Sequence, residues 1–129
     1  MCAIDGRENT IKVINLEDKF KKFDELWSPK IISRVDNYDV KIVKVKGELV
    51  WHDHKDEDEL FYIIKGKFRV ELEDGIIEIN PGELVVIPKG KKHRPFADEE
   101  TWMMVLESSK IKHTGDVITE KTLKEFEEI

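Results

Sequence analysis

Residues 68–79 read FRVELEDGIIEI and carry the clearest strand pattern in the chain. The first six residues alternate apolar and charged side chains, which is the period of a strand with one solvated face. Asp74-Gly75 is a hairpin signal, and Ile77 and Ile79 continue the alternation beyond it. This stretch therefore predicts two antiparallel strands joined by a tight turn.

The same pattern extends on both sides of this hairpin, where short apolar stretches alternate with turn signals. The turn signals are built from residues that tolerate a positive φ or preset a turn. They are Asp36-Asn37, Lys46-Gly47, Lys65-Gly66, Asn80-Pro81-Gly82 and Pro88-Lys89-Gly90. Many short strands at this spacing predict an all-β, antiparallel sandwich or barrel, with its core at about residues 30–108.

Two of the expected strands, at residues 60–64 and 102–106, are apolar on both faces. A strand of this kind needs cover on its outer side as well as its core side. An N-terminal helix or a second subunit would supply that cover; alternatively, both strands lie deep within one domain. Because symmetric dimers are the commonest oligomers, we predict a homodimer.

A short helix is predicted near the N-terminus, at about residues 16–23. Leu16, Phe20 and Phe23 fall on one face of such a helix. Asn15 precedes it and is a suitable N-cap, since its side chain can accept a hydrogen bond from an orphan backbone N–H.

A second short helix is predicted at about residues 119–128. Leu123, Phe126 and Ile129 lie three residues apart, a spacing typical of a short amphipathic helix laid on a domain. No repeat or low-complexity linker interrupts the chain, so we predict a single domain over residues 1–129.

Length and composition exclude several classes of protein. The 129 residues carry 22 Lys and Arg against 28 Asp and Glu, for a formal net charge of -6, and 40% are hydrophobic. The apolar runs are far shorter than the roughly 20 residues of a membrane helix, and no apolar leader follows Met1, so we expect a cytoplasmic protein without a membrane partner. The acidic balance and the absence of a helix-turn-helix segment argue against a nucleic-acid partner. Cys2 is the only cysteine, which excludes a thiolate metal cluster.

Three histidines and one glutamate form a candidate set of metal ligands. His52 and His54 are two residues apart, so on a strand their imidazoles share a face. Glu59 opens the next apolar strand, and His93 follows a later turn. Nitrogen and oxygen donors of this kind suit one divalent transition metal: Fe, Mn, Co, Ni or Zn. The alternative is that residues 52–59, which are strongly charged, form only a solvated loop.

The wider spacing resembles the two signature motifs of the cupin superfamily. The matching patterns are Gly47-x4-His52-x-His54-x4-Glu59-x6-Gly66 and Gly82-x5-Pro88-x-Gly90-x2-His93. The resemblance covers about residues 40–106 and implies a small jelly-roll barrel, the double-stranded β-helix, with His52, His54, Glu59 and His93 as the ligands of one metal. The gap before His52 is one residue shorter than usual, and Ala97 replaces a frequent asparagine; neither departure touches a ligand.

The resemblance implies a small metal-dependent enzyme acting on a small molecule, of isomerase or dioxygenase type. Residues 60–66 look like those of stand-alone cupins labelled mannose-phosphate-isomerase-like, a label that does not fix the chemistry. Two alternatives are a non-catalytic module that binds or senses a small ligand, and a metal-free barrel enzyme acting on nucleotide sugars. No general acid or base can be nominated from the sequence. His113 is expected to be an exposed loop residue without a ligand role.

Overall fold

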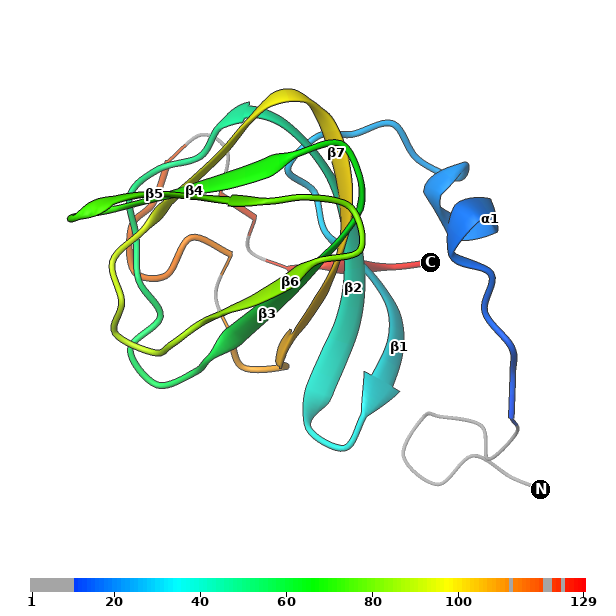
Figure 1. The fold of residues 1–129 in the computed structure, drawn as a ribbon. Coiled ribbons are helices and arrows are strands. Elements are labelled where there is room, and N and C mark those ends of the chain that lie inside the picture. The colour runs from blue at the N-terminus through cyan, green and yellow to red at the C-terminus, as the bar shows by residue number, and fades with distance from the viewer. Residues whose placement is uncertain (1–10, 112, 120–121, 124) are drawn as a thin grey trace.

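The computed structural model describes residues 11–111, 113–119, 122–123 and 125–129. Within these residues the chain forms one short helix and eight strands, which confirms the all-β class (Figure 1). In chain order the elements are α1 (Leu16–Phe20), β1 (Lys30–Val35), β2 (Tyr38–Glu48), β3 (Glu59–Lys65), β4 (Phe68–Leu72), β5 (Gly75–Ile79), β6 (Leu84–Ile87), β7 (Arg94–Ser108) and β8 (Glu127–Glu128). No helix in the described part of the chain is long and apolar enough to cross a membrane.

The strands form a jelly-roll barrel that is organised around β7, the longest strand. β2 pairs with β7 along most of its length, whereas β4 pairs with the first residues of β7 and β3 with its last residues. All of these pairings are antiparallel, and β5 and β6 extend the sheet from β4 and β3. Because one strand joins the three others, the sheet curls and encloses an interior (Figure 1).

The interior is filled by the residues that alternation turns inward. Along β3 the buried positions are Glu59, Phe61 and Ile63, with half-buried residues between them. Met103 and Val105 of β7 lie opposite Ile63 and Phe61 and are almost fully buried. Each apolar side chain removed from water in this way stabilises the fold by about 1.5–3 kcal/mol.

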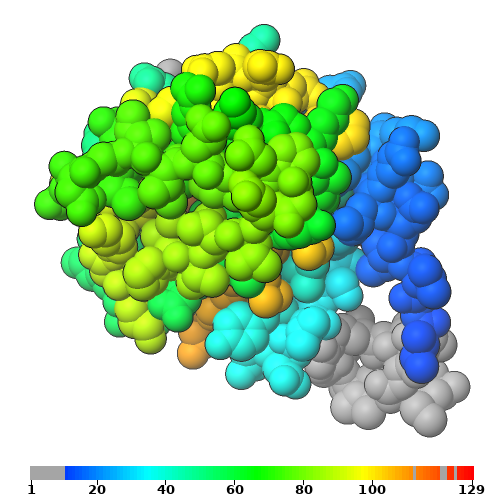
Figure 2. Space-filling view, viewed as in Figure 1, coloured from blue at the N-terminus to red at the C-terminus, as the bar shows by residue number. Residues whose placement is uncertain are grey.

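The N-terminal helix α1 covers part of the outer face of the sheet (Figure 2). Asn15 caps it as predicted, because its side chain accepts a hydrogen bond from the Asp18 amide at 3.0 Å. Phe20 is fully buried, and its ring stacks on Trp102 of β7 with the ring centroids 4.8 Å apart. The helix ends at Phe20, earlier than predicted: a turn follows, in which the Lys22 amide bonds the Lys19 carbonyl at 3.1 Å, and the Phe23 carbonyl accepts a hydrogen bond from Lys44 Nζ at 2.7 Å.

The helix therefore covers one end of the two strands that are apolar on both faces. Other apolar side chains on or beside this outer face stay exposed, including Val35, Tyr38, Leu84 and Val86. The predicted homodimer would cover them, and it stays a prediction.

The predicted C-terminal helix at residues 119–128 is wrong for the residues that the structure describes there; residues 120, 121 and 124 lie outside them. Glu127 and Glu128 instead form β8, which runs parallel to β1. Partners on β1 impose this extended conformation: Lys30 Nζ lies 2.8 Å from the Glu127 carboxylate, and Arg34 pairs with Glu128. These contacts outweigh the weak helical spacing of the tail, which spans barely two turns.

Gly66, in the turn between β3 and β4, packs closely against Thr101 and Glu100, and this contact can be tested by substitution. It has a φ of 88°, and an added Cβ would lie 2.5 Å from Thr101 Oγ1 and 2.7 Å from the Glu100 carbonyl oxygen. We expect Gly66→Ala to lower the free energy of unfolding by about 2–3 kcal/mol, because it adds a clash to the strain of a left-handed backbone. Urea denaturation measures the loss.

Gly82→Ala is the matched control, because Gly82 has a φ of 85° but nothing within 4 Å of an added Cβ. This variant should lose only the backbone term, about 1–2 kcal/mol. Equal losses in the two variants would show that the contact with Thr101 is unimportant.

Candidate metal centre

Two segments that are far apart in the sequence bring the histidines together. His52 and His54 follow β2, and His93 immediately precedes β7. The backbones of His52 and His93 are joined by a pair of hydrogen bonds, each amide donating to the other carbonyl at 2.9 Å. This bridge sets the two imidazoles beside each other, with their ring centroids 4.6 Å apart.

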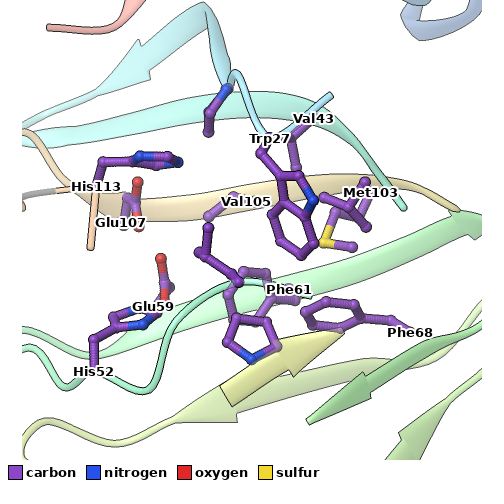
Figure 3. A pocket seen from close by; sticks show the side chains of 14 residues that line it. Trp27, Val43, His52, Glu59, Phe61, Phe68, Met103, Val105, Glu107 and His113 are labelled. Carbon is purple, nitrogen blue, oxygen red and sulfur yellow. The ribbon is translucent and has the colours of Figure 1, made fainter. Parts of the chain in front are cut away.

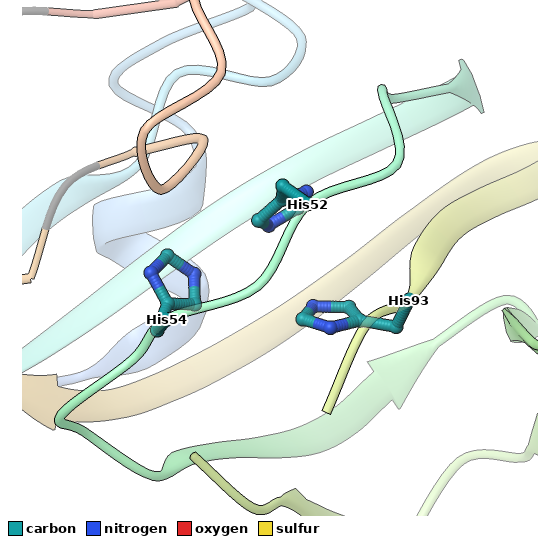
Figure 4. Close-up of side chains that lie close together, drawn as sticks. All are labelled: His52, His54 and His93. Carbon is teal, nitrogen blue, oxygen red and sulfur yellow. The ribbon is translucent and has the colours of Figure 1, made fainter. Parts of the chain in front are cut away.

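His52, His54 and His93 form a compact buried group, which we call the histidine cluster (Figure 4). One ring nitrogen from each residue lies within 4.8 Å of the other two. Neighbouring donors on one transition metal lie about 3.0–3.4 Å apart at bond lengths of about 2.1 Å, so the three rings would have to draw together by about 1 Å to hold one ion. The three residues are 3%, 6% and 1% exposed, which leaves almost no room for water to solvate them.

Backbone carbonyls orient two of the rings. His52 Nδ1 lies 2.8 Å from the Val50 carbonyl oxygen, and His93 Nδ1 lies 2.8 Å from that of Lys91. A carbonyl only accepts, so Nδ1 carries the proton and Nε2 is left with a free lone pair. His54 Nε2 and His93 Nε2 are buried and have no hydrogen-bond partner among the residues that the structure describes. Buried polar atoms are normally paired, so these two nitrogens fit a metal site.

The histidines are held in their neutral form. Burial lowers the pKa of His52 to about 3 and that of His54 to about 4. It also lowers the pKa of His93 below its usual value. Neutral imidazole is the form that binds metals.

Glu59, at the start of β3, faces the same space. Its Oε1 lies 3.6 Å from His54 Nε2 and 3.9 Å from His93 Nε2. Burial raises the pKa of Glu59 well above its usual value, and the negative charge of Glu107 and a hydrogen bond with it raise it further. A divalent cation would reverse this effect, since a positive charge at that distance favours the carboxylate.

A second polar group lies beside Glu59 and was not predicted. Lys41 Nζ lies 2.6 Å from Glu107 Oε1, and both side chains are buried. Among the described residues no N–H or hydroxyl group donates to the other oxygen, Glu107 Oε2, and the Glu107 carboxylate is also hydrogen-bonded with Glu59. The sequence does hold a signal: Lys41 is in phase with the core residues Val43 and Val45, which is an unusual place for a charge.

The expectation that His113 is exposed is wrong. It is half-buried, and its Nδ1 accepts a hydrogen bond from the Leu123 amide at 3.1 Å. Its ring packs edge-on against Phe126, with the centroids 5.9 Å apart. Tertiary contacts with the tail hold His113 against the barrel. No local pattern in the sequence predicts these contacts.

Four of the residues described above, His52, Glu59, Glu107 and His113, help to line a cavity of about 50 Å³, which we call the inner cavity (Figure 3). Glu59, Glu107, His52 and His113 lie toward one end, whereas the rings of Trp27, Phe61 and Phe68 and the side chain of Met103 lie toward the other. The space holds several water molecules or a small organic group. The inner cavity therefore borders the histidine cluster and has one polar and one apolar end.

Fold and site together define a small jelly-roll barrel with a buried histidine cluster that could hold a metal ion. The sequence model of the Cupin domain family matches residues 40–109, more than half of the chain. The chain therefore belongs to the cupin family.

Known relatives agree with this assignment. A cupin-2 domain containing protein from Shewanella frigidimarina NCIMB 400 is 45% identical, with a TM-score of 0.74 over 74% of this chain and 94% of that one. A protein from Neisseria meningitidis is 31% identical, with a TM-score of 0.69 over 76% of this chain and all of that one (100%). The uncharacterized protein YdbB of Bacillus subtilis (strain 168) is 35% identical over 66 residues; these are 49% of this chain but only 57% of that curated relative.

The lowered pKa values predict that the metal-free protein loses stability in acid. In the unfolded chain both histidines titrate near 6.5, whereas in the folded chain His52 titrates near 3 and His54 near 4. Between these values the unfolded state binds more protons, so the free energy of unfolding must fall as the pH falls from 6.5 toward 4. Each histidine contributes at most about 1.4 kcal/mol per pH unit. Urea denaturation of metal-free protein at several pH values measures this slope.

The control is the double variant His52→Gln, His54→Gln, which lacks both titrating groups and keeps all the carboxylates. Its stability should fall less steeply over the same pH range. The explanation fails if the slopes of the variant and the wild type coincide.

Proposed function

We propose that His52, His54, His93 and Glu59 hold one divalent transition metal and that the protein is a small metal-dependent enzyme acting on a small molecule. One observation carries this proposal: the Nε2 atoms of His54 and His93 are buried, and no group in the described part of the chain hydrogen-bonds to them. Leaving such atoms without a partner is costly, and a metal ion would satisfy both.

The chain supplies what a catalytic ion needs. Carbonyl oxygens hold the His52 and His93 rings in the tautomer that offers Nε2, and Glu59 adds one negative charge. A metal with open coordination positions would supply Lewis-acid chemistry, by polarising a carbonyl or hydroxyl oxygen. Nitrogen and oxygen donors suit Fe, Mn, Co, Ni and Zn, so the identity of the ion is a matter for measurement.

The inner cavity supports an enzyme because it gives a small molecule a place beside two of the proposed ligands, His52 and Glu59. A module that binds a ligand without converting it is the second candidate. It is favoured by the pairing of Glu107 Oε1 with Lys41 and of His113 Nδ1 with Leu123, which leaves fewer groups to move a proton. The single domain over residues 1–129, the homodimer and the cytoplasmic location stay predictions.

Elemental analysis of untagged protein purified without chelator tests the metal. We expect close to one ion per chain, directly or after reconstitution with each of the five metals, and a higher melting temperature of the loaded form, because a ligand that binds only the folded state stabilises it. Failure of all five metals to bind would overturn the proposal. If iron binds, oxygen consumption by the iron form with candidate substrates separates a dioxygenase from an isomerase.

A further inference from the structure

The loop between β2 and β3, residues 49–58, carries His52 and His54, and we call it the histidine loop. The chain that leaves β7 passes beside this loop, as the orange ribbon in Figure 4 shows, and we call its residues 113–117 the flanking segment. The two meet at Gly115 and Asp53, the residue between the two histidines. Gly115 has a φ of 58°, and a Cβ added to it would lie only 2.0 Å from the Asp53 carbonyl oxygen. The contact therefore requires a glycine.

Beside this contact, a cleft of about 190 Å³ separates the flanking segment from the histidine loop. Residues 53–57 line one side of the cleft, and Lys110, Gly115 and Asp116 line the other. An ion pair crosses it, with Lys55 Nζ 3.7 Å from Asp116 Oδ2, but these side chains are 72% and 59% exposed. Ion pairs as exposed as this one contribute little to stability. The backbone contact at Gly115, and not this ion pair, therefore sets the distance between the two segments.

The flanking segment is anchored on its other side. Thr114 is fully buried, and its hydroxyl donates a hydrogen bond to the Val117 carbonyl. The same hydroxyl oxygen lies 2.7 Å from the Thr122 hydroxyl, which belongs to the tail of the chain. Buried hydrogen bonds of this kind resist a movement of the segment away from the histidine loop, because such a movement would leave polar atoms unpaired.

The histidine loop is anchored on both sides of Asp53. The His52 amide donates to the His93 carbonyl at 2.9 Å, and the His54 carbonyl accepts a hydrogen bond from the Gly90 amide at 2.8 Å. Both neighbours of Asp53 therefore have fixed backbones. A displacement of the Asp53 peptide must be taken up by the two residues beside it, which are the ones that carry the imidazoles.

The displacement that a side chain at Gly115 would cause is large on the scale of the site. A Cβ comes no closer than about 3.0 Å to a backbone oxygen, so an added Cβ must push the Asp53 carbonyl away by about 1 Å. The three imidazoles would have to draw together by about the same distance to hold one ion. A side chain at Gly115 would thus disturb the ligand spacing by as much as metal binding has to adjust it.

We propose that the flanking segment is part of the metal centre and that Gly115 is a positioning residue, whose backbone holds Asp53, and thereby His52 and His54, at the spacing from which one ion can be bound. This inference rests on the proposed function in taking the histidines as metal ligands. It extends the site beyond residue 109, where the match to the Cupin domain family ends. The contact is made by the backbone of the segment, so it does not need the side chain of His113.

Gly115→Ala tests the proposal, and Gly66→Ala is its matched control. Each variant adds a clashing Cβ at a glycine with positive φ, but the clash of Gly66 is with Thr101 and Glu100, outside the histidine loop. Competition with a chelator measures the zinc affinity, and circular dichroism checks the fold. We expect Gly115→Ala to bind zinc about 10–100-fold more weakly than the wild type, the usual loss when residues that orient metal ligands are changed. Gly66→Ala should stay within about threefold of the wild type.

The absorption spectrum of the cobalt-loaded protein gives a second readout, because it reports the arrangement of the donors and not the stability of the fold. The spectrum should change in Gly115→Ala and stay the same in Gly66→Ala. If Gly115→Ala does not fold, Thr114→Val takes its place. This variant keeps the size of the buried side chain but removes the hydroxyl that anchors the flanking segment, so it should weaken zinc binding by at least about threefold.

An unchanged zinc affinity in Gly115→Ala, or in Thr114→Val where that variant replaces it, would overturn the role of the flanking segment. An equal loss in Gly66→Ala would overturn it as well, because the loss would then follow from lower stability alone. A wild-type protein that takes up neither zinc nor cobalt contradicts the proposed function instead. The positioning is then tested on metal-free protein by nuclear Overhauser effects between the rings of His52 and His54, whose centroids lie 5.0 Å apart. These effects should weaken in Gly115→Ala and not in Gly66→Ala; equal effects in all three proteins would overturn the inference.

Discussion

The His93→Ala protein should bind its metal at least about 100-fold more weakly than the wild type while keeping the barrel fold. Loss of residues that merely orient metal ligands typically costs 10–100-fold, and His93 is proposed to be a ligand itself. It is 1% exposed, and its backbone bridge to His52 does not involve the side chain, so the strand pairing should survive. Competition with a chelator measures the affinity, and circular dichroism checks the fold.

His113→Ala is the matched control, because His113 lines the inner cavity without belonging to the histidine cluster. Its metal affinity should stay within about threefold of the wild type. Full metal occupancy in His93→Ala, or an equal loss in His113→Ala, would contradict the proposed ligand set.

Part of the site could be predicted because it depends on a local sequence pattern, the alternation of a strand. The alternation of β3 correctly places Glu59 in phase with Phe61 and Ile63. His52 and His54, however, lie between β2 and β3 and not on the strand that their spacing suggested. The approach of His93, in contrast, depends on the pairing of two distant segments, which strand periodicity does not specify. Only the resemblance to the cupin motifs predicted that His93 lies beside His52 and His54.

The parts that could not be predicted depend on tertiary contacts that override local pattern. The spacing of Phe126 and Ile129 predicted a helix, but their segment is held extended by β1 and by the buried Lys41 beneath Phe126. His113 was assigned to the surface because nothing near it in the sequence shows that the tail folds back over the barrel. No local pattern marks Glu107, because its buried ion pair is with Lys41, on a strand that is distant in sequence.

The largest effect on stability is expected for Lys41→Ala, which should lower the free energy of unfolding by about 3–5 kcal/mol. Lys41 is fully buried, and its removal leaves the Glu107 carboxylate without its cation in the core, next to Glu59. The contact of Lys41 Nζ with the ring of Phe126 is lost as well. Urea denaturation of the metal-free protein measures the change.

The double variant Lys41→Met, Glu107→Leu should recover most of this loss and lie within about 1 kcal/mol of the wild type, because apolar residues of similar size often replace a buried ion pair at no cost. Equal losses in the single and double variants would show that lost packing, and not an unpaired buried charge, lowers the stability of Lys41→Ala. If the double variant is as stable as the wild type, folding does not require the pair. The place of the pair beside Glu59, a proposed metal ligand, is then explained by the chemistry of the site and not by the stability of the barrel.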